Sequence, residues 1–412
     1  MWGSMSQRNI KEYSPIVGES VVDELFLLAD KLRGKVIQNV NSTAVGGGVA
    51  EILANMVPLL KQLGVDTRWD VIKGNEKFFL ITKKIHNALH GVDVTFSDEE
   101  FDFFKQVNAE NAAEIQSYGD VVFIHDSQPI ALIEKKKEIG RKWIWRCHID
   151  FTQPTAQIET FLRDYIERYD SAVFSAQAFS RRLSIPQVLI APSIDPLSDK
   201  NRDLPQETIT SVLETFGIDP QRPIVTQISR FDYLKDPVGV IEVYRKVKQY
   251  VDCQLVLAGG GATDDPEGAK VLEEVQNAAA DDHDIHVILL PSGSNIEINA
   301  LQRASSVVLQ KSLKEGFGLT VAEALWKSKP VIAGAVGGIP QQIKHKYSGI
   351  LTYSIDGTVY YLKQLLNDPD YAKRLGTNGR EHVKNNFLIT RHIREYILLF
   401  LSLYYTDDVV RF

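Results

Sequence analysis

The sequence contains few cysteines and no long apolar run. Only Cys147 and Cys253 are present among 412 residues, which excludes a disulfide framework or thiolate metal cluster and predicts two buried thiols. No segment reaches the ~20 apolar residues of a membrane-spanning helix, and the nearest candidate, residues 397–405, is too short. Residues 1–30 carry charges throughout and lack the apolar core of a signal peptide. We therefore expect a cytoplasmic protein with no membrane partner.

Basic charge is also scarce. Lys and Arg number 46 against 53 Asp and Glu, for a formal net charge of −7. A nucleic-acid-binding surface normally shows as a basic patch or stripe, so we expect no nucleic-acid partner. An anionic ligand would then be held locally, by Arg and Lys residues of the loops.

A complete dinucleotide-binding fingerprint is absent. In the loop of residues 45–52 the G-x-G-x-x-G spacing would need glycine where Glu51 stands, and a second glycine run fails in the same way at Asp264. The pattern disfavours a nicotinamide oxidoreductase. Consecutive glycines before a predicted helix still expose amides at its positive end, so Gly47 and Gly48 are candidates for contact with an anionic or hydroxyl-rich ligand. The alternative is a tight turn that lets helix and strand pack closely.

The chain does contain a repeated alternation of short β-branched apolar runs with segments of helical periodicity. Its length exceeds that of one ordinary core, so at least two domains are expected. The alternation predicts an α/β protein with two doubly wound parallel sheets, whose domains face a central cleft. Six strands are predicted in each half, at 35–40, 65–72, 121–125, 143–147, 171–176 and 188–192, and at 223–229, 253–259, 285–290, 306–310, 330–334 and 349–353.

The predicted domains follow from this pattern. The polar, proline-bounded segment 195–205 has the composition of a linker. Because ligands of open α/β sheets bind at the carboxyl ends of the strands, the loops that follow strands are the places to seek a site. We expect a helical leader, a first Rossmann-like domain, a second one and a C-terminal helix that crosses back to the first, over residues 1–34, 35–195, 196–385 and 386–412.

Two motifs in the second half place charge in such loops. "SRFDYLKDP" carries Arg230 and Lys235, a guanidinium and an ammonium that form a natural clamp for a diphosphate. "KEGFGLTVAEAL" carries Glu315 and Glu323 around a glycine turn. Each motif alone also fits a simpler interpretation, namely two solvated loop cations and a solvated helix carboxylate. Short motifs have high false-positive rates, so the combination matters more than either part.

The first half offers a second set of polar residues. "FIHDSQP" places His125 and Asp126 after one predicted strand, and "RCHIDF" places His148 and Asp150 after the next. A single histidine after a strand is more often structural than catalytic. Four polar side chains at two adjacent strand ends favour a site.

The combination Arg-x4-Lys, then Glu-x7-Glu, then "GGIP" resembles the donor-binding half of retaining glycosyltransferases of the GT-B architecture, and the resemblance covers nearly the whole chain. It implies that Arg230 and Lys235 grip the diphosphate of a nucleotide sugar. It implies further that Glu315 meets hydroxyls of the donor sugar and that Glu323 accepts hydrogen bonds from the ribose. The turn amides would approach the sugar and phosphate, at Gly316, Phe317, Gly318 and Leu319.

The "HD" pair and "NSTAVGGGVAEIL" resemble the corresponding segments of trehalose synthases of the glycosyltransferring type. The resemblance implies an acceptor site at Asp126, with His125 and Asp150, and a catalytic group of Arg230, Lys235, Glu315 and His148, with His148 near the reacting carbon. The implied reaction moves glucose, with retention, from a nucleotide-diphosphate glucose to free glucose, is reversible, and forms trehalose.

Several points stay open in the sequence. Gln341 follows "GGIP" where many family members carry glutamate, so it is assigned no role. Metal-ligand spacing is absent, so no tightly bound cofactor and no metal site is expected, although a loosely held Mg²⁺ is compatible. A transferase with a lipid or polysaccharide acceptor and a non-catalytic nucleotide-sugar-binding protein are the alternatives. The sequence does not distinguish adenosine, uridine and guanosine donors or establish a homodimer.

Overall fold

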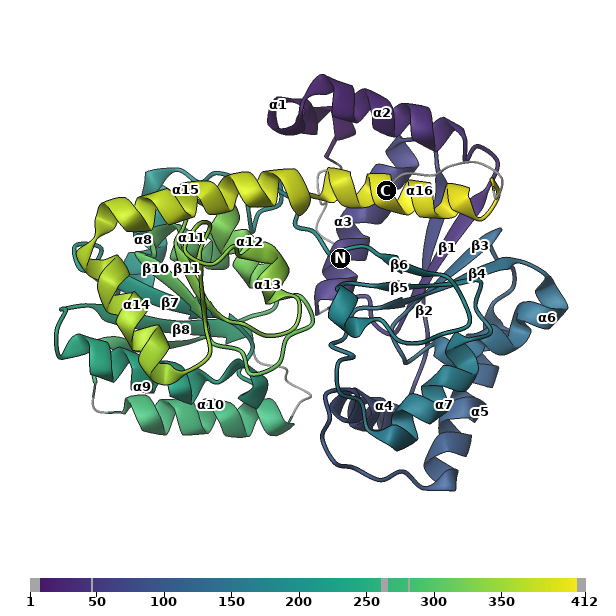
Figure 1. The fold of residues 1–412 in the computed structure, drawn as a ribbon, viewed down its shortest axis with the longest axis horizontal. Coiled ribbons are helices and arrows are strands. Elements are labelled where there is room, and N and C mark those ends of the chain that lie inside the picture. Colours follow the sequence, from purple (N-terminus) through teal and green to yellow (C-terminus); the bar gives the residue numbers. More distant parts are fainter. Residues whose placement is uncertain (1–7, 46, 261–265, 281, 406–412) are drawn as a thin grey trace. The chain divides into compact units, whose positions relative to one another are not determined.

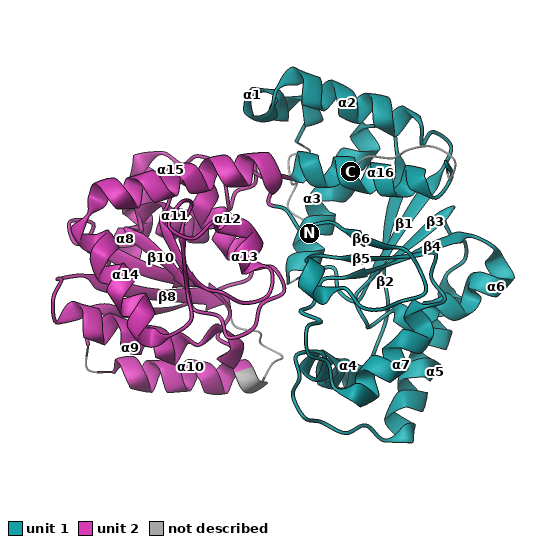
Figure 2. Cartoon of the chain, viewed as in Figure 1, with its two compact units in different colours: residues 1–193, 389–412 teal, residues 194–388 magenta. Residues whose placement is uncertain are grey.

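The computed structural model describes residues 8–45, 47–260, 266–280 and 282–405. The chain divides into two compact units, unit 1 of residues 1–193 with 389–412 and unit 2 of residues 194–388 (Figure 2). The boundaries predicted from the sequence, after residues 195 and 385, lie two and three residues from these. Each unit is built around its own parallel sheet.

The sheet of unit 1 has six parallel strands in the order β2-β1-β3-β4-β5-β6 (Figure 1). The strand order reverses between β1 and β3, so the loops after these two strands diverge to opposite faces and leave room for a ligand at the carboxyl edge. The strands are β1 (Val36–Asn41), β2 (Asp66–Val71), β3 (Val121–His125), β4 (Lys142–Cys147), β5 (Ser171–Phe174) and β6 (Gln187–Leu189).

The sheet of unit 2 has the order β12-β11-β10-β7-β8-β9, again with every pair parallel. Here the order reverses between β7 and β10. These strands are β7 (Ile224–Ile228), β8 (Gln254–Gly260), β9 (Ile285–Leu290), β10 (Val307–Gln310), β11 (Val331–Gly334) and β12 (Ile350–Thr352). The predicted α/β fold with two doubly wound parallel sheets is confirmed.

Helices cover both faces of the unit 1 sheet. Trp143 and Trp145 point from β4 into a core shared with α4, α5 and α7. On the other face, α16 packs on α2 and α3, and its Tyr396 meets the ring of Phe123 on β3 at 5.0 Å. The helices of unit 1 are α1 (Ser14–Val17), α2 (Glu19–Asp30), α3 (Gly48–Gln62), α4 (Glu76–Leu89), α5 (Asp98–Glu114), α6 (Lys136–Ile139), α7 (Ala156–Ile166) and α16 (Ile389–Ser402).

The apolar run at 397–405 lies largely in α16, where residues 397–401 are buried. Within the described part of the chain, no helix has both the length and the apolar character needed to cross a membrane. Cys147 and Cys253 are both buried, as predicted from their scarcity, and burial raises the pKa of each thiol.

Unit 2 repeats the layered plan with a different set of helices. Some of them begin where the sequence supplies a cap: the side chain of Ser354 accepts from the amide of Gly357 at α14, and that of Asp236 from Gly239 at α9. The helices are α8 (Gln206–Thr215), α9 (Pro237–Lys248), α10 (Pro266–Ala279), α11 (Asn295–Ala304), α12 (Leu319–Trp326), α13 (Ile339–Gln342), α14 (Ile355–Asn367) and α15 (Pro369–Asn386).

The segment 195–205 is not the solvated linker that its composition suggested. It belongs to unit 2, and Asp195, Ser198 and Asn201 are buried. The Asn201 amide donates to the Asp195 carbonyl at 3.0 Å and to the Ser198 hydroxyl at 3.1 Å. The polar side chains therefore satisfy a buried turn, since backbone groups away from water need partners.

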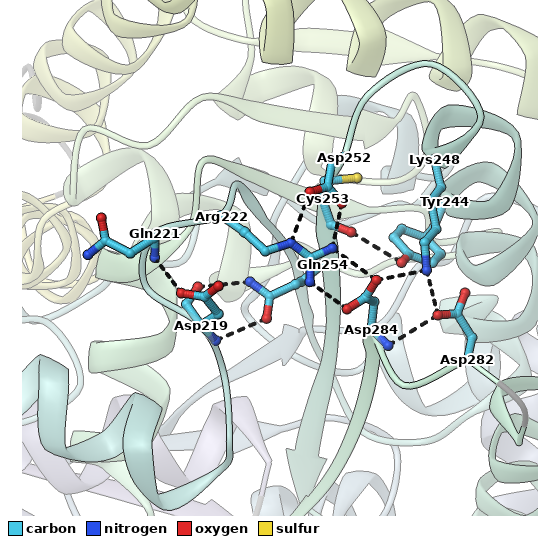
Figure 3. A network of polar contacts seen from close by, with 10 residues as sticks. All are labelled: Asp219, Gln221, Arg222, Tyr244, Lys248, Asp252, Cys253, Gln254, Asp282 and Asp284. Atoms are coloured by element: carbon cyan, nitrogen blue, oxygen red, sulfur yellow. Dashed lines mark hydrogen bonds and ion pairs between the residues drawn. The ribbon is translucent and has the colours of Figure 1, made fainter.

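A polar network ties the amino ends of β7, β8 and β9 together, at the edge of the unit 2 sheet opposite the strand ends that carry the motifs (Figure 3). Arg222 donates to both carboxylate oxygens of Asp284, at 2.6 and 2.9 Å, and also to Asp252. Lys248 bridges Asp282 and Asp284. These contacts hold the pKa of Asp284 well below its usual range, first through Arg222 and then through Lys248. The network is placed to stabilise the sheet rather than to act on a substrate.

Replacing Arg222 with methionine should lower the free energy of unfolding of unit 2 by about 2 kcal/mol, or about 4–8 °C in Tm, without changing the rate of catalysis. Because the pKa of Asp284 is depressed in the folded protein, its contribution to the free energy of unfolding is present above about pH 4 and is lost on acidification. The variant should therefore lose less stability than the wild-type protein below that pH. Thermal unfolding by circular dichroism at several pH values measures both. Arg374→Met, at an exposed arginine of α15, is the control; equal Tm values for the two variants would contradict the role of Arg222.

Candidate active site

The two motifs of unit 2 meet at its topological switch point. Arg230 and Lys235 lie in the loop after β7, and Glu315 lies in the loop after the neighbouring β10. The Lys235 ammonium donates to Glu315 Oε2 at 2.7 Å, and the Ser312 hydroxyl reaches the same oxygen at 3.1 Å. Both charged side chains are largely buried. Two residues 80 positions apart in the sequence thus form one polar centre at the carboxyl edge of the sheet.

Arg230 differs from Lys235 in its surroundings. Its side chain is 57% exposed, and its ion pair is a loose one, with Asp232 at 3.7 Å. An arginine that is open to solvent beside a buried ion pair can turn its planar donor fork to an incoming phosphate. The simpler interpretation of two solvated loop cations fails for Lys235, which is paired and mostly buried.

The glycine turn after Glu315 packs against the "GGIP" segment and is hydrogen-bonded to it. Gly337 has φ 55°, and a Cβ atom there would overlap the carbonyl oxygen of Glu315. The amide of Gly338 donates to the Gly316 carbonyl at 3.0 Å, and the buried Gln342 side chain donates to the Phe317 carbonyl. The two motifs therefore occur together because the backbone of one rests on the backbone of the other.

Glu323 is not the solvated helix carboxylate of the simpler interpretation. It lies on α12, which starts after Gly318 at φ 82°, and only 3% of its side chain is exposed. Lys200, from the buried turn of residues 195–205, places its ammonium 3.7 Å from Glu323 Oε1. A buried carboxylate needs a compensating partner, and the 195–205 turn provides one.

Asp126, in unit 1, has a strained backbone that its neighbours hold in place. Its φ is 63°, a left-handed value that few residues other than glycine adopt. Its amide donates to the Arg146 carbonyl at 2.7 Å, its carbonyl accepts from the Trp145 indole at 2.8 Å, and its Oδ1 accepts from the His148 amide at 2.7 Å. Strain that is overdetermined in this way concentrates at functional sites.

Asp126 is half-buried, and desolvation raises its pKa to about 7; the hydrogen bond from the His148 amide and the charge of Arg146 oppose the shift. Arg146 itself is fully buried on β4 and donates to the Ser175 hydroxyl at 3.3 Å. Among the described residues, its Nε and Nη1 have no hydrogen-bond partner. The charge of the guanidinium therefore acts on the neighbouring His125, Asp126 and His148.

The remaining candidates of unit 1 fall into three groups. His125 and His148 contact each other, with His125 Nδ1 and His148 Nε2 3.1 Å apart. Asp150 is buried, and its Oδ1 accepts from the amide and the hydroxyl of Thr152 at 2.9 and 2.6 Å, so it shapes its own loop. Gly47 precedes α3 with φ 84°, and none of the described residues has an atom within 4 Å of where a Cβ would lie, which argues against close packing as the reason for glycine. Gly48 is the first residue of α3.

Sequence reasoning missed several residues that support these groups. Asn39 and Arg146 are buried polar residues within central strands, an inconsistency with the surrounding apolar pattern that could have revealed them. Ser312 stands two residues before "KEGFGLTVAEAL", and Gln342 stands two residues after "GGIP". No sequence signal pointed to Lys200, because the composition of its segment is typical of a linker. In the described part of the chain no group of three or more His, Cys, Asp or Glu side chains could hold a metal ion.

Two family models match the chain. The N-terminal domain of trehalose synthase matches residues 39–181, and glycosyl transferases group 1 match residues 210–382. A trehalose synthase from Thermococcus litoralis is 43% identical over 401 residues, which covers 96% of this chain and 97% of the relative. The chain belongs to the trehalose synthase family of group 1 glycosyltransferases.

Solved structures show the fold of this glycosyltransferase independently. A UDP-forming α,α-trehalose-phosphate synthase from Burkholderia xenovorans, in complex with glucose-6-phosphate, has a TM-score of 0.73 at 14% identity, over 90% of this chain and 100% of that one. A structure described as trehalose-6-phosphate from E. coli bound with UDP-2-fluoro glucose has a TM-score of 0.71 at 14% identity, over 91% and 100%. The predicted GT-B architecture is confirmed.

Proposed function

We propose that the protein is a retaining hexosyltransferase that moves glucose from a nucleotide-diphosphate glucose to free glucose, forming α,α-trehalose reversibly. The observation that carries the proposal is the polar centre of Lys235 and Glu315, with the open guanidinium of Arg230 in the same loop as Lys235. The trehalose synthase from Thermococcus litoralis and the nucleotide sugar in the E. coli structure support the substrate class.

In unit 2 the charged side chains would bind different parts of the donor. Arg230 would supply the uncompensated positive charge for the diphosphate, and Lys235 would donate hydrogen bonds from an ammonium whose charge Glu315 balances. A lone Glu315 carboxylate would repel a diphosphate, but its pairing with Lys235 cancels that repulsion and leaves oxygen lone pairs for sugar hydroxyls. Glu323 would accept from the ribose hydroxyls. The amides of the turn from Gly316 to Leu319 would complete the contacts to sugar and phosphate.

Catalysis would come from stabilising the departing diphosphate. Glycosyl transfer passes through an oxocarbenium-like state in which the anomeric carbon becomes positive and the leaving group gains negative charge. Retention follows if the acceptor hydroxyl attacks from the face that the diphosphate leaves, with a phosphate oxygen taking its proton. No glutamate forms a covalent intermediate in this scheme. No tightly bound cofactor takes part, and a loosely held Mg²⁺ would only screen phosphate charge; adding EDTA to the assay tests this.

In unit 1 the chemistry suits an uncharged acceptor. After β3 and β4 the carboxyl group of Asp126 and the imidazole of His148 are half-buried, whereas His125, Asp150 and the guanidinium of Arg146 are buried. A sugar phosphate would need accessible cations. Hydroxyl groups need acceptors, which carboxylates provide. Free glucose therefore fits these residues better than a phosphorylated sugar.

The test is a matrix of three donors against three acceptor conditions. Adenosine, uridine and guanosine diphosphate glucoses, labelled in the sugar, are incubated with glucose, with glucose 6-phosphate and with no acceptor. We expect labelled disaccharide with glucose, and NMR should show α,α linkage. Transfer only to the sugar phosphate would identify another acceptor class, and binding without any release of nucleotide diphosphate would favour a non-catalytic protein. Either result contradicts the proposal.

Replacing Asp126 with asparagine should lower kcat/KM for glucose about thirtyfold while the KM for the donor stays within about twofold, because one charged acceptor is lost. Asparagine tolerates the left-handed backbone and still accepts from the His148 amide. Since the wild-type pKa is about 7, kcat/KM for glucose should rise with pH through that value as the carboxylate forms. That inflection should vanish in the variant. Unchanged acceptor kinetics would remove Asp126 from the site.

A further inference from the structure

A continuous chain of hydrogen bonds runs through three neighbouring strands of unit 1. Asn39 stands on β1, His125 ends β3 and His148 follows β4, strands that are adjacent or next but one in the sheet (Figure 1). His125 Nε2 lies 3.2 Å from Asn39 Oδ1, and His125 Nδ1 lies 3.1 Å from His148 Nε2. Asn39 and His125 are buried, while His148 is half-buried. The outer end of the chain is therefore His148.

The orientation of Asn39 is fixed by its other neighbours. Its Nδ2 lies 3.3 Å from the Thr67 hydroxyl and 3.3 Å from the carbonyl oxygen of Arg68. A carbonyl can only accept a hydrogen bond, so the amide NH₂ faces β2 and the oxygen faces His125. The reverse orientation would bring two oxygens together in a buried place. Asn39 thus offers His125 an acceptor and no donor.

Both imidazoles are neutral. Burial and the charge of Arg146 on β4 lower the pKa of His125 to about 3. Burial, Arg146, His125 and His392 of α16 together lower the pKa of His148 well below its usual value. A neutral imidazole carries one N–H donor and one acceptor nitrogen, so each ring has two tautomers to choose between.

Asn39 determines which ring nitrogen of His125 carries the proton, and His125 in turn determines it for His148. His125 must place its proton on Nε2 to donate to the Asn39 oxygen, which leaves its Nδ1 as an acceptor. His148 must in turn place its proton on Nε2 to donate to that acceptor. What remains is the Nδ1 lone pair of His148; among the described residues this atom has no hydrogen-bond partner, and it is not one of the fully buried polar atoms.

We propose that Asn39 is a positioning residue, which acts through His125 to hold His148 in its Nε2–H tautomer so that His148 Nδ1 accepts a hydrogen bond from a sugar hydroxyl. Asn39 itself touches no substrate. The inference rests on the proposed function only for the identity of the hydroxyl, since the tautomers are set within unit 1. It also accounts for an asparagine in the middle of a buried parallel strand, where β-branched residues are the rule.

The tautomers can be observed without any substrate. The full chain, labelled with ¹⁵N in its nine histidines, is recorded by long-range proton–nitrogen correlation near neutral pH, and His125→Gln and His148→Gln assign the two rings. We expect Nε2 of both rings to carry the proton and Nδ1 of both to show the shift of an unprotonated nitrogen. A proton on His148 Nδ1 in the wild-type protein would overturn the proposal, whether or not the protein makes a disaccharide.

Asn39→Leu removes the acceptor and keeps the number of side-chain heavy atoms, and the tautomer ratio of His148 should move toward Nδ1–H about fivefold, with a similar loss in kcat. Thr67→Val is the matched control, because it removes one partner of Asn39 in the same buried strand pair but leaves the Arg68 carbonyl to orient the amide. It should leave the tautomers unchanged. Unchanged tautomers in Asn39→Leu, or the same change in Thr67→Val, would overturn the proposal; if Asn39→Leu fails to fold, the wild-type spectrum decides.

Discussion

Arg230→Ala should lower kcat for glucosyl transfer about a hundredfold, equivalent to ~3 kcal/mol of barrier, while the protein unfolds at the wild-type temperature. The rate falls because the guanidinium would meet the charge that develops on the departing diphosphate. Stability is unaffected because the side chain is 57% exposed and its ion pair with Asp232, at 3.7 Å, is loose. Steady-state kinetics at saturating donor and glucose, with thermal unfolding beside them, measure both effects.

Two further variants sharpen this test. Arg374→Ala removes an exposed arginine of the same unit, which lies over the ring of Tyr371 at 5.1 Å, and should leave kcat within about twofold. Arg230→Lys keeps the charge but not the planar fork, so only part of the rate should return. If Arg230→Ala turns over near the wild-type rate at saturating donor, the diphosphate assignment is wrong.

Glu323→Gln should lower kcat/KM for the donor about thirtyfold, since a charged acceptor for the ribose hydroxyls becomes a neutral amide of the same size. The substitution preserves the packing of α12, which an alanine at this 3% exposed position would not. The sharper readout is discrimination. The wild-type enzyme should prefer a ribonucleotide donor over its 2′-deoxy analogue about tenfold, and the variant less than about twofold.

The control for Glu323 is another helical carboxylate of unit 2. Glu381→Gln, at an exposed position on α15, should change neither the rate nor the discrimination. A Glu323→Gln enzyme that still rejects the deoxy donor as strongly as the wild type would show that the ribose is bound elsewhere. Glu323 would then serve only to pair with Lys200 inside unit 2.

The strands and the strand ends that carry chemistry could be predicted from the sequence for a clear reason. Strands buried on both faces are continuous apolar runs, as at residues 121–124 and 307–309, and such runs can be recognised in the sequence without any knowledge of their neighbours. Parallel sheets then place the following loops at one edge. Arg230 follows a predicted strand directly, and Glu315 lies in the loop five residues after the end of another.

The environment of each candidate could not be predicted, because it depends on residues distant in the sequence. Composition made residues 195–205 a linker, whereas the fold buries Asn201 and brings Lys200 to Glu323. Arg230 and Lys235 read as an equivalent pair of cations, but Lys235 is paired with Glu315 and Arg230 is open. The sequence spacing of Arg230 and Lys235 contains no information about which of them Glu315 will contact.

By itself the sequence determined that the protein has two doubly wound parallel sheets and that its charged motifs lie in the loops after their strands, because hydrophobic periodicity and glycine turns are local properties. Only the tertiary structure decided which residues act together. Asn39 is the clearest example. Its amide is oriented by a hydrogen bond to the Arg68 carbonyl on β2, and its oxygen determines which nitrogen of His125 on β3 carries the proton. Hydrogen bonds between strands depend on register and side-chain direction, which exist only once the sheet has formed.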